Sequence, residues 1–414
     1  MNDPRGAIHG FVEAHRTDAV DMLAALVRTP SDNPPGDCAP HAERAAALLE
    51  RLGFAVERHR VPDDELARGA MASCVNLIVR ERFGPGPTIA CNAHGDVVPP
   101  GAGWSMDPYA AEIRDGRMFG RGVAVSKSDF ATYAFALLAL RAAVAAGARI
   151  AGAVELHFTH DEEVGGALGP AWLLSRGLTR PDYAICAGFA HGVTIAHNGC
   201  LHLEVEVRGR SGHAAEPDKG VDALRAATGI LAGLYELSGE YAKTRSRTAG
   251  IASPTLVIGT IEGGINTNVV PDRVVFRLDR RIIPEEVPAQ AEATLTRQIR
   301  DLGGRFPGIA VDIRRILLAR PFLPLPGQEK LVEALRRNAR SVLGEDIPAH
   351  GVPLYTDARH YSAAGVPTVL YGAGPRALAE ANGHRADENL RLTDLYAAIE
   401  VVALSLHDLL APEA

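Results

Sequence analysis

Two groups of side chains in this sequence have the types and spacing needed for metal chemistry. The first is His94 and Asp96, at the end of an apolar run that begins at Thr88. Residues two apart on a strand point to the same face, so Asp96 is placed to hold the second ring nitrogen of a metal-bound His94. A histidine at a strand end more often has a structural role, so this pair alone is weak evidence.

The second group is the run Asp161-Glu162-Glu163, which follows a strand predicted over residues 152–159. Adjacent carboxylates repel one another, and an interior cluster of them needs a cation or a proton to neutralise it. With a metal present, one carboxylate can bind the ion while its neighbour acts as a general base toward water. A solvated helix N-terminus would explain the same tripeptide equally well.

The surrounding sequence predicts the elements that position these groups. Strand-like runs at 54–58, 74–79, 88–93 and 152–159 alternate with helical segments at 11–28, 39–52 and 130–146. This alternation predicts a largely parallel α/β sheet, in which ligands gather at the carboxyl ends of the strands. Because both groups fall at such ends, we expect them to share one site.

The pattern changes near residue 199. Residues 201–208 alternate between apolar and polar types, as in a half-exposed antiparallel strand. Strands at 254–261 and 273–281 and helices at 221–237 and 286–302 complete an α+β unit, and the α/β pattern resumes after 314. We therefore predict a catalytic domain in two parts, residues 1–198 and 315–414, with an inserted lid domain at 199–314.

Composition excludes several classes of function. The chain has 414 residues, of which 47% are hydrophobic and 22% charged, as in ordinary globular proteins. A net charge of -7 offers no basic surface for nucleic acid, and charged residues interrupt the longest apolar stretch, 124–151, before it could span a membrane. The N-terminus lacks a secretory pattern and the five cysteines are scattered. We expect a cytoplasmic protein with a small-molecule substrate and reduced thiols.

Further motifs follow in a fixed order. They are Gly120-Arg121-Gly122 with Lys127, Gly212-His213, Asn268 before Pro271-Asp272, Asp279 with Arg281, and His384 before Asp387-Glu388. Each could singly be a turn or a surface element. Together with the two acidic and histidine groups, they resemble the M20 metallopeptidase family, which includes acetylornithine deacetylase, succinyl-diaminopimelate desuccinylase, aminoacylases and glutamate carboxypeptidase.

The resemblance covers nearly the whole chain and implies a fold and a set of roles. The implied fold is a zinc-peptidase-like three-layer α/β domain, interrupted by an α+β lid that forms a homodimer. The implied metal ligands are His94, Glu163 and His384, with Asp96 orienting His94 and Glu162 as the general base. In the lid, His213 of the partner subunit would donate to the oxyanion, and Asn268 and Arg281 would lie near the substrate. Arg281 could equally be the partner of a lid carboxylate.

Two positions depart from the family pattern. Val125 stands where the family has an aspartate that bridges two zinc ions, and Ala187 stands where it has an acidic ligand. Without these two negative charges a two-metal centre is not expected. Two imidazoles and one carboxylate suffice for a single ion, so we predict one divalent metal per chain, Zn, Mn or Fe. His160, His191, His197 and Asp129 are possible replacement ligands.

The predicted function is metal-dependent hydrolysis of a C–N bond in a small carboxylated substrate, such as an N-acyl amino acid or a dipeptide. One alternative is an aminohydrolase that acts on an amine or ureido group, for which an altered ligand set would be suited. The second alternative is a binding protein on a degenerate peptidase scaffold. The retained side chains of Glu162, Glu163, His94, His213 and His384 argue against that second alternative.

Overall fold

The computed structural model describes residues 3–412, and the chain divides into two compact units. The main unit comprises the residues up to Ile195, 324–350 and those from Thr356 onward; the inserted unit comprises 196–323 and 351–355. The predicted start of the insertion, 199, lies close to the observed one. The predicted end, 314, instead falls inside strand β14 (Ala310–Ala319), a strand that was not predicted from the sequence.

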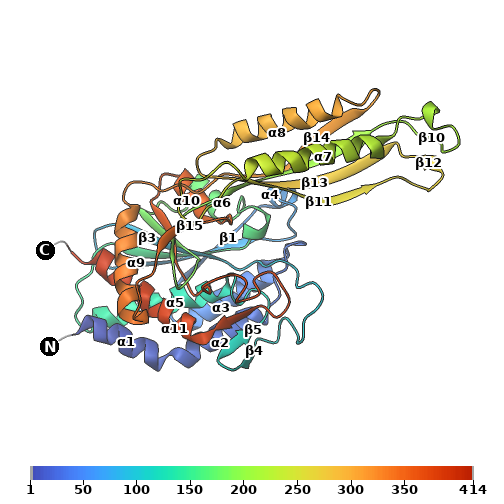
Figure 1. The fold of residues 1–414 in the computed structure, drawn as a ribbon. Coiled ribbons are helices and arrows are strands. Elements are labelled where there is room, and N and C mark those ends of the chain that lie inside the picture. The colour runs from blue at the N-terminus through green and yellow to red at the C-terminus, as the bar shows by residue number, and fades with distance from the viewer. Residues whose placement is uncertain (1–2, 413–414) are drawn as a thin grey trace. The chain divides into compact units, whose positions relative to one another are not determined.

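The main unit contains most of the helices and the larger sheet (Figure 1). Its helices are α1 (Pro4–Ala14), α2 (Arg16–Val27), α3 (Ala39–Arg51), α4 (Asp63–Arg68), α5 (Lys127–Ala145), α6 (Pro170–Ser175), α9 (Gln328–Leu343), α10 (Ala358–Ala363) and α11 (Leu392–Leu410). Its strands are β1 (Val56–Arg60), β2 (Val75–Arg82), β3 (Thr88–His94), β4 (Glu112–Arg114), β5 (Arg117–Phe119), β6 (Ala153–Thr159), β7 (Tyr183–Cys186), β16 (Thr368–Leu370) and β17 (Asn389–Arg391). Strands β8 (Val193–His197) and β15 (Ala349–Val352) run across the boundary between the units.

The larger sheet has eight strands in the order β1-β2-β6-β3-β7-β16-β8-β15. Its central strands β6, β3, β7 and β16 are parallel. Antiparallel pairs extend this centre on both sides, β1 with β2 and β2 with β6 on one, β16 with β8 on the other. The sheet is therefore mixed, and the predicted parallel arrangement holds only for its centre.

Helices cover both faces of this sheet, which gives three layers. Figure 1 shows α5 and α11 on one side and α6 and α10 on the other. Strands β3 and β6 are accordingly buried along almost their whole length, as strands of a covered parallel sheet are. Helix α5 is long and apolar enough to span a membrane by composition alone, but most of it is buried in the main unit, as in a core helix.

One predicted helix is divided in two. The sequence pattern predicts a single helix over 11–28, whereas the structure has α1 and α2 separated at His15. The backbone of His15 leaves the helical region, and its ring stacks on Phe11 with centroids 3.9 Å apart. The apolar faces of both helices remain buried, so the periodicity was similar to that of one continuous helix.

The inserted unit is an antiparallel sheet covered by two helices. Its elements are β9 (Gly199–Arg208), β10 (Gly212–His213), α7 (Ala223–Tyr241), β11 (Thr255–Gly263), β12 (Val269–Val270), β13 (Arg273–Ile282), α8 (Pro288–Gly303) and β14. The four long strands lie in the order β11-β13-β9-β14. In β9, Leu201, Leu203, Val205 and Val207 pack into a core with α7 and α8, while the alternate residues face away. The predicted two-residue period is confirmed.

Candidate metal centre

The residues predicted to carry the chemistry lie at the carboxyl ends of β3 and β6. These strands pair in parallel with His94 beside Thr159. The 3₁₀ turn that begins at Glu162 lies just beyond β6, so its acidic side chains reach the edge where β3 delivers His94. The chain segments approach closely here: a Cβ at Gly95 would lie 2.7 Å from the ring of His41, which explains the glycine.

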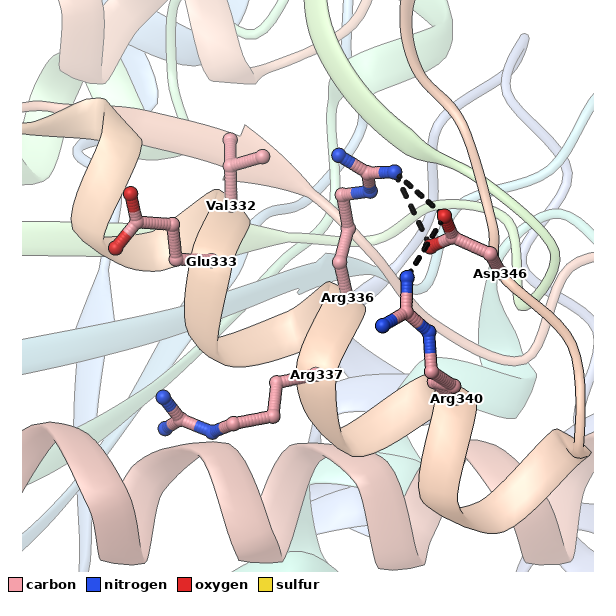
Figure 2. A pocket seen from close by; sticks show the side chains of 6 residues that line it. All are labelled: Val332, Glu333, Arg336, Arg337, Arg340 and Asp346. Carbon is pink, nitrogen blue, oxygen red and sulfur yellow. Dashed lines mark hydrogen bonds and ion pairs between the residues drawn. The ribbon is translucent and has the colours of Figure 1, made fainter.

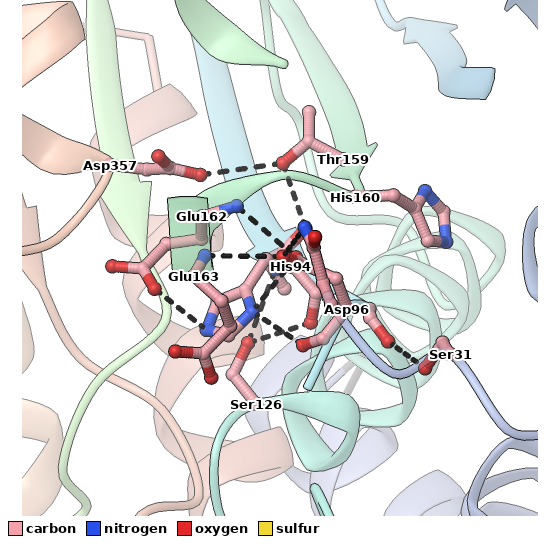
Figure 3. A network of polar contacts seen from close by, with 12 residues as sticks. Ser31, His94, Asp96, Ser126, Thr159, His160, Glu162, Glu163 and Asp357 are labelled. Carbon is pink, nitrogen blue, oxygen red and sulfur yellow. Dashed lines mark hydrogen bonds and ion pairs between the residues drawn. The ribbon is translucent and has the colours of Figure 1, made fainter. Parts of the chain in front are cut away.

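Four side chains from three segments converge at this edge, and Figure 3 shows three of them, His94, Glu162 and Glu163. His94, Glu162 and Glu163 offer ligand atoms that all lie within 4.8 Å of one another. His94 Nε2 is 3.9 Å from Glu162 Oε2. His384, from the loop before β17, places its Nε2 3.2 Å from Glu163 Oε1. The structure thus brings together the three predicted metal ligands and the predicted general base.

The surroundings of His94 determine which of its nitrogens can bind a metal. Its Nδ1 lies 3.0 Å from the backbone carbonyl oxygen of Asp96 and 3.4 Å from that residue's Oδ1. Both neighbours are acceptors, so Nδ1 carries the proton and donates it. In the neutral ring, Nε2 then has a free lone pair directed at the acidic cluster, which is the arrangement of a metal-binding imidazole.

Asp96 holds the two halves of the site together. It is fully buried and accepts hydrogen bonds from the backbone N–H groups of Glu162, at 3.2 Å, and Glu163, at 3.1 Å. Asn33 Nδ2 donates a third at 3.0 Å. Burial alone would raise the pKa of Asp96, but His94 and Asn33 together lower it. Asp96 is therefore a buried carboxylate that fixes both the histidine and the acidic turn.

The site holds more buried negative charge than the chain neutralises. Burial raises the pKa of Glu162 to about 8, with repulsion from Glu163 opposing the attraction of His94. Burial and the charge of Glu162 raise the pKa of Asp357 to about 7. Burial followed by the charge of Asp357 also raises the pKa of Asp161. A bound cation would favour the ionised forms of these groups.

The donor atoms suit a divalent metal. Glu163 Oε1 is buried, and His384 Nε2 lies 3.2 Å from it. A buried carboxylate needs a positive charge beside it, which a protonated His384 or a bound cation can supply. Imidazole nitrogen with carboxylate oxygen is a donor set that suits Zn, Mn or Fe. The residues present therefore fit a metal ion.

Neither departing position supplies a ligand atom. Val125 is partly buried, and its Cγ2 lies within 3.7 Å of where a Cβ of Gly383 would stand, beside the loop that bears His384. Ala187 carries only a methyl group, and its backbone N–H donates to Asn92 O at 2.8 Å. Two apolar side chains thus stand at the positions where the resemblance implies carboxylates.

The Gly120-Arg121-Gly122 and Asp387-Glu388 motifs bind one another. Arg121 Nη1 donates to Glu388 Oε2 at 2.6 Å, and both side chains are almost completely buried. The other carboxylate oxygen accepts the backbone N–H groups of Ala124, at 3.1 Å, and Val125, at 3.2 Å. These motifs therefore fix the loop that leads to α5 and the position of Val125.

The possible replacement ligands in the main unit have other partners. His160 Nδ1 lies 3.1 Å from Val75 O and its Nε2 3.0 Å from His41 Nδ1, so both ring nitrogens are engaged. His191 pairs with Glu345 and Asp394. Asp129 accepts the backbone N–H groups of Ala373, at 2.7 Å, and Gly188, at 3.2 Å. The fourth, His197, lies in the inserted unit, where its Nδ1 is 2.8 Å from Asn198 O.

Two further residues contribute to this site and were not predicted from the sequence. Asp357 precedes α10, is buried, and faces Thr159, whose hydroxyl lies 3.5 Å from Asp357 Oδ2 (Figure 3). Ser126 forms two hydrogen bonds with the backbone of His94, through its hydroxyl to the carbonyl at 3.0 Å and from the N–H at 3.1 Å. Only the adjacency of Ser126 to Val125 could have indicated its position; nothing local indicated Asp357.

The predicted lid residues lie in the inserted unit. His213, on β10, and Asn268, before β12, are exposed neighbours, because the N–H of Ala214 donates to Asn268 O at 3.0 Å. His213 Nδ1 accepts the N–H of Ala215 at 3.0 Å, so its proton lies on Nε2, which can donate outward. Arg281 Nε donates to Asp279 Oδ1 at 3.0 Å. Arg281 is therefore paired with a carboxylate of the lid, as its alternative interpretation predicted.

A separate surface hollow lies on α9 and has no comparable chemistry. Figure 2 shows it, lined by Val332, Glu333, Arg336, Arg337, Arg340 and Asp346. Two of its arginines already pair with Asp346, Arg336 at 3.1 Å and Arg340 at 2.9 Å. These are exposed ion pairs of a solvated surface, which contribute little individually.

Solved structures share this fold. A dipeptidase, Dug1p of Saccharomyces cerevisiae, aligns with a TM-score of 0.77 over 98% of both chains at 14% identity. Human carnosine dipeptidase 1 aligns with a TM-score of 0.75 over 98% of this chain and 99% of that one, at 18% identity. The Bacillus subtilis YXEP protein, described as a dinuclear metal binding peptidase, aligns at 0.66 over 96% and 99%, with 17% identity.

Sequence comparison gives the family. A succinyl-diaminopimelate desuccinylase of Rhizorhabdus wittichii is 29% identical over 402 residues, 93% of this chain and 96% of that protein. An acetylornithine deacetylase of Myxococcus xanthus is 32% identical over 280 residues, 66% of this chain and 70% of that protein. The model of peptidase family M20/M25/M40 matches residues 90–408. This chain is therefore an enzyme of the M20/M25/M40 family of hydrolases.

Proposed function

We propose that this enzyme hydrolyses the amide bond of a small carboxylated substrate, an N-acyl amino acid or a dipeptide, with one divalent metal per chain. The observation that carries the proposal is the convergence of His94, Glu162 and Glu163 within 4.8 Å, with His384 beside them. The named activities of the relatives, desuccinylation and deacetylation, are both hydrolyses of an N-acyl amide.

The metal would be held by His94 Nε2, Glu163 and His384. When bound, it supplies Lewis acidity that stabilises negative charge developing on the scissile carbonyl. A single ion is proposed because Val125 and Ala187 remove the two carboxylates that a second ion would need. Zn, Mn and Fe all suit this donor set.

Glu162 is proposed as the general base. It takes a proton from the attacking water, which becomes the nucleophile, and then delivers that proton to the departing nitrogen. Its carboxylate lies 3.9 Å from His94 Nε2, at the edge of the ligand cluster. Asp96 holds the backbone of the turn in place and so keeps Glu162 in register with His94.

The lid contributes in this proposal through a second copy of the chain. His213 Nε2–H of a partner lid would donate to the oxyanion, with Asn268 and Arg281 near the substrate's polar groups. The outward-directed proton of His213 supports such a donor role. A homodimer formed through the lid, in the cytoplasm, is the corresponding assembly, and sedimentation of the purified protein would test it.

The test pairs a substrate panel with one variant. Metal-loaded protein would be assayed against N-acetylornithine, N-succinyl-diaminopimelate, dipeptides and ureido compounds. We expect release of a free amino group and a carboxylic acid from one N-acyl or peptide class. Glu162→Gln should lower kcat by about 10²- to 10⁴-fold with KM little changed. Glu13→Gln, an exposed carboxylate paired with Arg16, is the matched control and should retain activity.

The altered ligand set favours one other activity. With apolar Val125 and Ala187 beside the metal ligands, the site differs from a two-metal peptidase, and an aminohydrolase on an amine or ureido group is the second candidate. Ammonia release in the same panel would establish it in place of amide hydrolysis. Full activity in Glu162→Gln would refute the assigned base, and binding without turnover in the wild type would favour a binding protein.

A further inference from the structure

We propose that the inserted unit contains a second metal site, formed by Cys200, His202 and Asp279, for a thiophilic divalent ion such as Zn²⁺. The three side chains offer ligand atoms that lie within 4.8 Å of one another. Cys200 and His202 belong to none of the motifs named above, and Asp279 belongs to one only as the neighbour of Arg281 in the inserted unit. The inference therefore does not rest on the proposed hydrolytic function.

The pairing of two strands assembles these residues. In the β9–β13 register, His202 lies opposite Asp279 and Cys200 lies opposite Arg281. Residues two apart on a strand share a face, so all four side chains lie on one face. That face is opposite the one on which Leu201 and Leu203 pack under the helices. The site is thus built on rigid sheet backbone.

The atomic distances approach those of a tetrahedral zinc site. Cys200 Sγ is 3.0 Å from His202 Nε2, which is 3.1 Å from Asp279 Oδ2. Sγ is 3.8 Å from both oxygens of Asp279. Zinc ligands at about 2.3 Å for sulfur and about 2.0–2.1 Å for nitrogen or oxygen lie about 3.4–3.6 Å apart in a tetrahedron. Shifts of about half an ångström in the side chains would reach this geometry.

Hydrogen bonding explains the cluster less well than a metal does. His202 Nε2 faces both the Cys200 sulfur and the Asp279 carboxylate. The Cys200 thiol is a weak donor that lies 3.8 Å from both Asp279 oxygens, and His202 Nε2 can donate to only one of its two neighbours. The convergence of three ligand atoms of different types on a common point is instead the arrangement that a coordinated cation requires.

Charge and access are also suitable. A Cys200 thiolate and the Asp279 carboxylate together carry the two negative charges that a divalent ion needs. Arg281 binds the other oxygen, Oδ1, at 3.0 Å and leaves Oδ2 toward His202. Cys200 is buried, but the side chains of His202 and Asp279 are 33% and 29% exposed, so an ion can enter from solvent. Water would fill the fourth position.

Cobalt(II) binding to the full chain tests this proposal. Only a thiolate ligand gives the strong near-ultraviolet thiolate-to-cobalt absorption, and the main-unit ligands are all nitrogen and oxygen. We expect this band in metal-free wild-type protein titrated with Co²⁺, and its suppression by competing Zn²⁺. Cys200→Ser should abolish the band. Cys186→Ser, a buried cysteine of the main unit, is the matched control and should retain it.

A second variant keeps the test decisive if Cys200→Ser folds poorly. His202 is partly exposed, so His202→Asn should fold. This variant should weaken the Co²⁺ affinity, measured from the thiolate band, by more than the roughly 10- to 100-fold loss typical of outer-sphere substitutions. The proposal is overturned if wild-type protein shows no thiolate band. It is also overturned if the band survives Cys200→Ser, or if His202→Asn leaves the affinity unchanged.

Discussion

Replacing Asp96 with Asn would test how the candidate metal centre is held together. The carboxylate accepts three N–H groups, from Asn33, Glu162 and Glu163, at 3.0–3.2 Å in a fully buried position. Asparagine offers one acceptor oxygen and one NH₂, so at least one donor would face another donor. Losing a charge-assisted hydrogen bond and leaving a buried N–H unpaired should together cost about 2–4 kcal/mol of unfolding free energy. Because His94 keeps the backbone carbonyl of residue 96 but loses the nearby carboxylate charge, metal affinity should fall roughly 10- to 100-fold.

Two measurements separate these effects. Urea unfolding of metal-free protein gives the stability change, and competition with a chromophoric chelator gives the metal dissociation constant. Asp218→Asn, at an exposed carboxylate of the inserted unit, is the matched control and should change neither quantity. An Asp96→Asn protein that binds metal with wild-type affinity would refute the role assigned to this carboxylate in orienting His94.

Three further predictions concern the main unit. Arg121→Met should lower the free energy of unfolding in urea by about 3–5 kcal/mol, because it leaves Glu388 charged and buried without its partner. Adding Glu388→Gln should recover much of that loss. Additive effects of the two substitutions would contradict this. Burial alone would raise the pKa of Glu155. Interactions with His157, Thr179 and Arg80 outweigh burial and hold this pKa at about 2, below its usual 4.5. This carboxylate therefore stabilises the fold above about pH 4.5 and loses its effect as pH falls toward 2. Glu155→Gln should cost about 2–3 kcal/mol at pH 7 and progressively less below pH 4.5; a pH-independent difference would refute it. Chelation should abolish turnover, and Zn, Mn or Fe(II) should restore it, without changing the far-ultraviolet circular dichroism.

Local sequence patterns predicted the elements that carry the site. The apolar run into His94 and the acidic run at Glu162 lie at the ends of parallel strands because such strands deliver their last residues to one edge of a sheet. The alternation in β9 was equally informative, since burying one face imposes a two-residue period. These features depend on neighbours in the chain, which is why a single sequence was sufficient for them.

Features that depend on distant segments were missed. Asp357 is brought to Thr159 by the packing of α10 against the sheet, which no local pattern records. The proposed metal site in the inserted unit also depends on distant segments, because only the pairing of β9 with β13 sets Asp279 opposite His202. The end of the inserted unit was placed too early because Arg314 and Arg315 interrupt the apolar residues of β14.

The most direct test of the proposed single-metal centre is an anomalous-difference map from crystals of the zinc-loaded protein. We predict one peak in the main unit, within bonding distance of His94 Nε2 and a carboxylate oxygen of Glu163. Any peak at Cys200 would be separate, in the inserted unit. Two peaks roughly 3.5–4 Å apart beside His94 would contradict the account, since Val125 and Ala187 would then not have removed the second ion. So would the absence of any peak there.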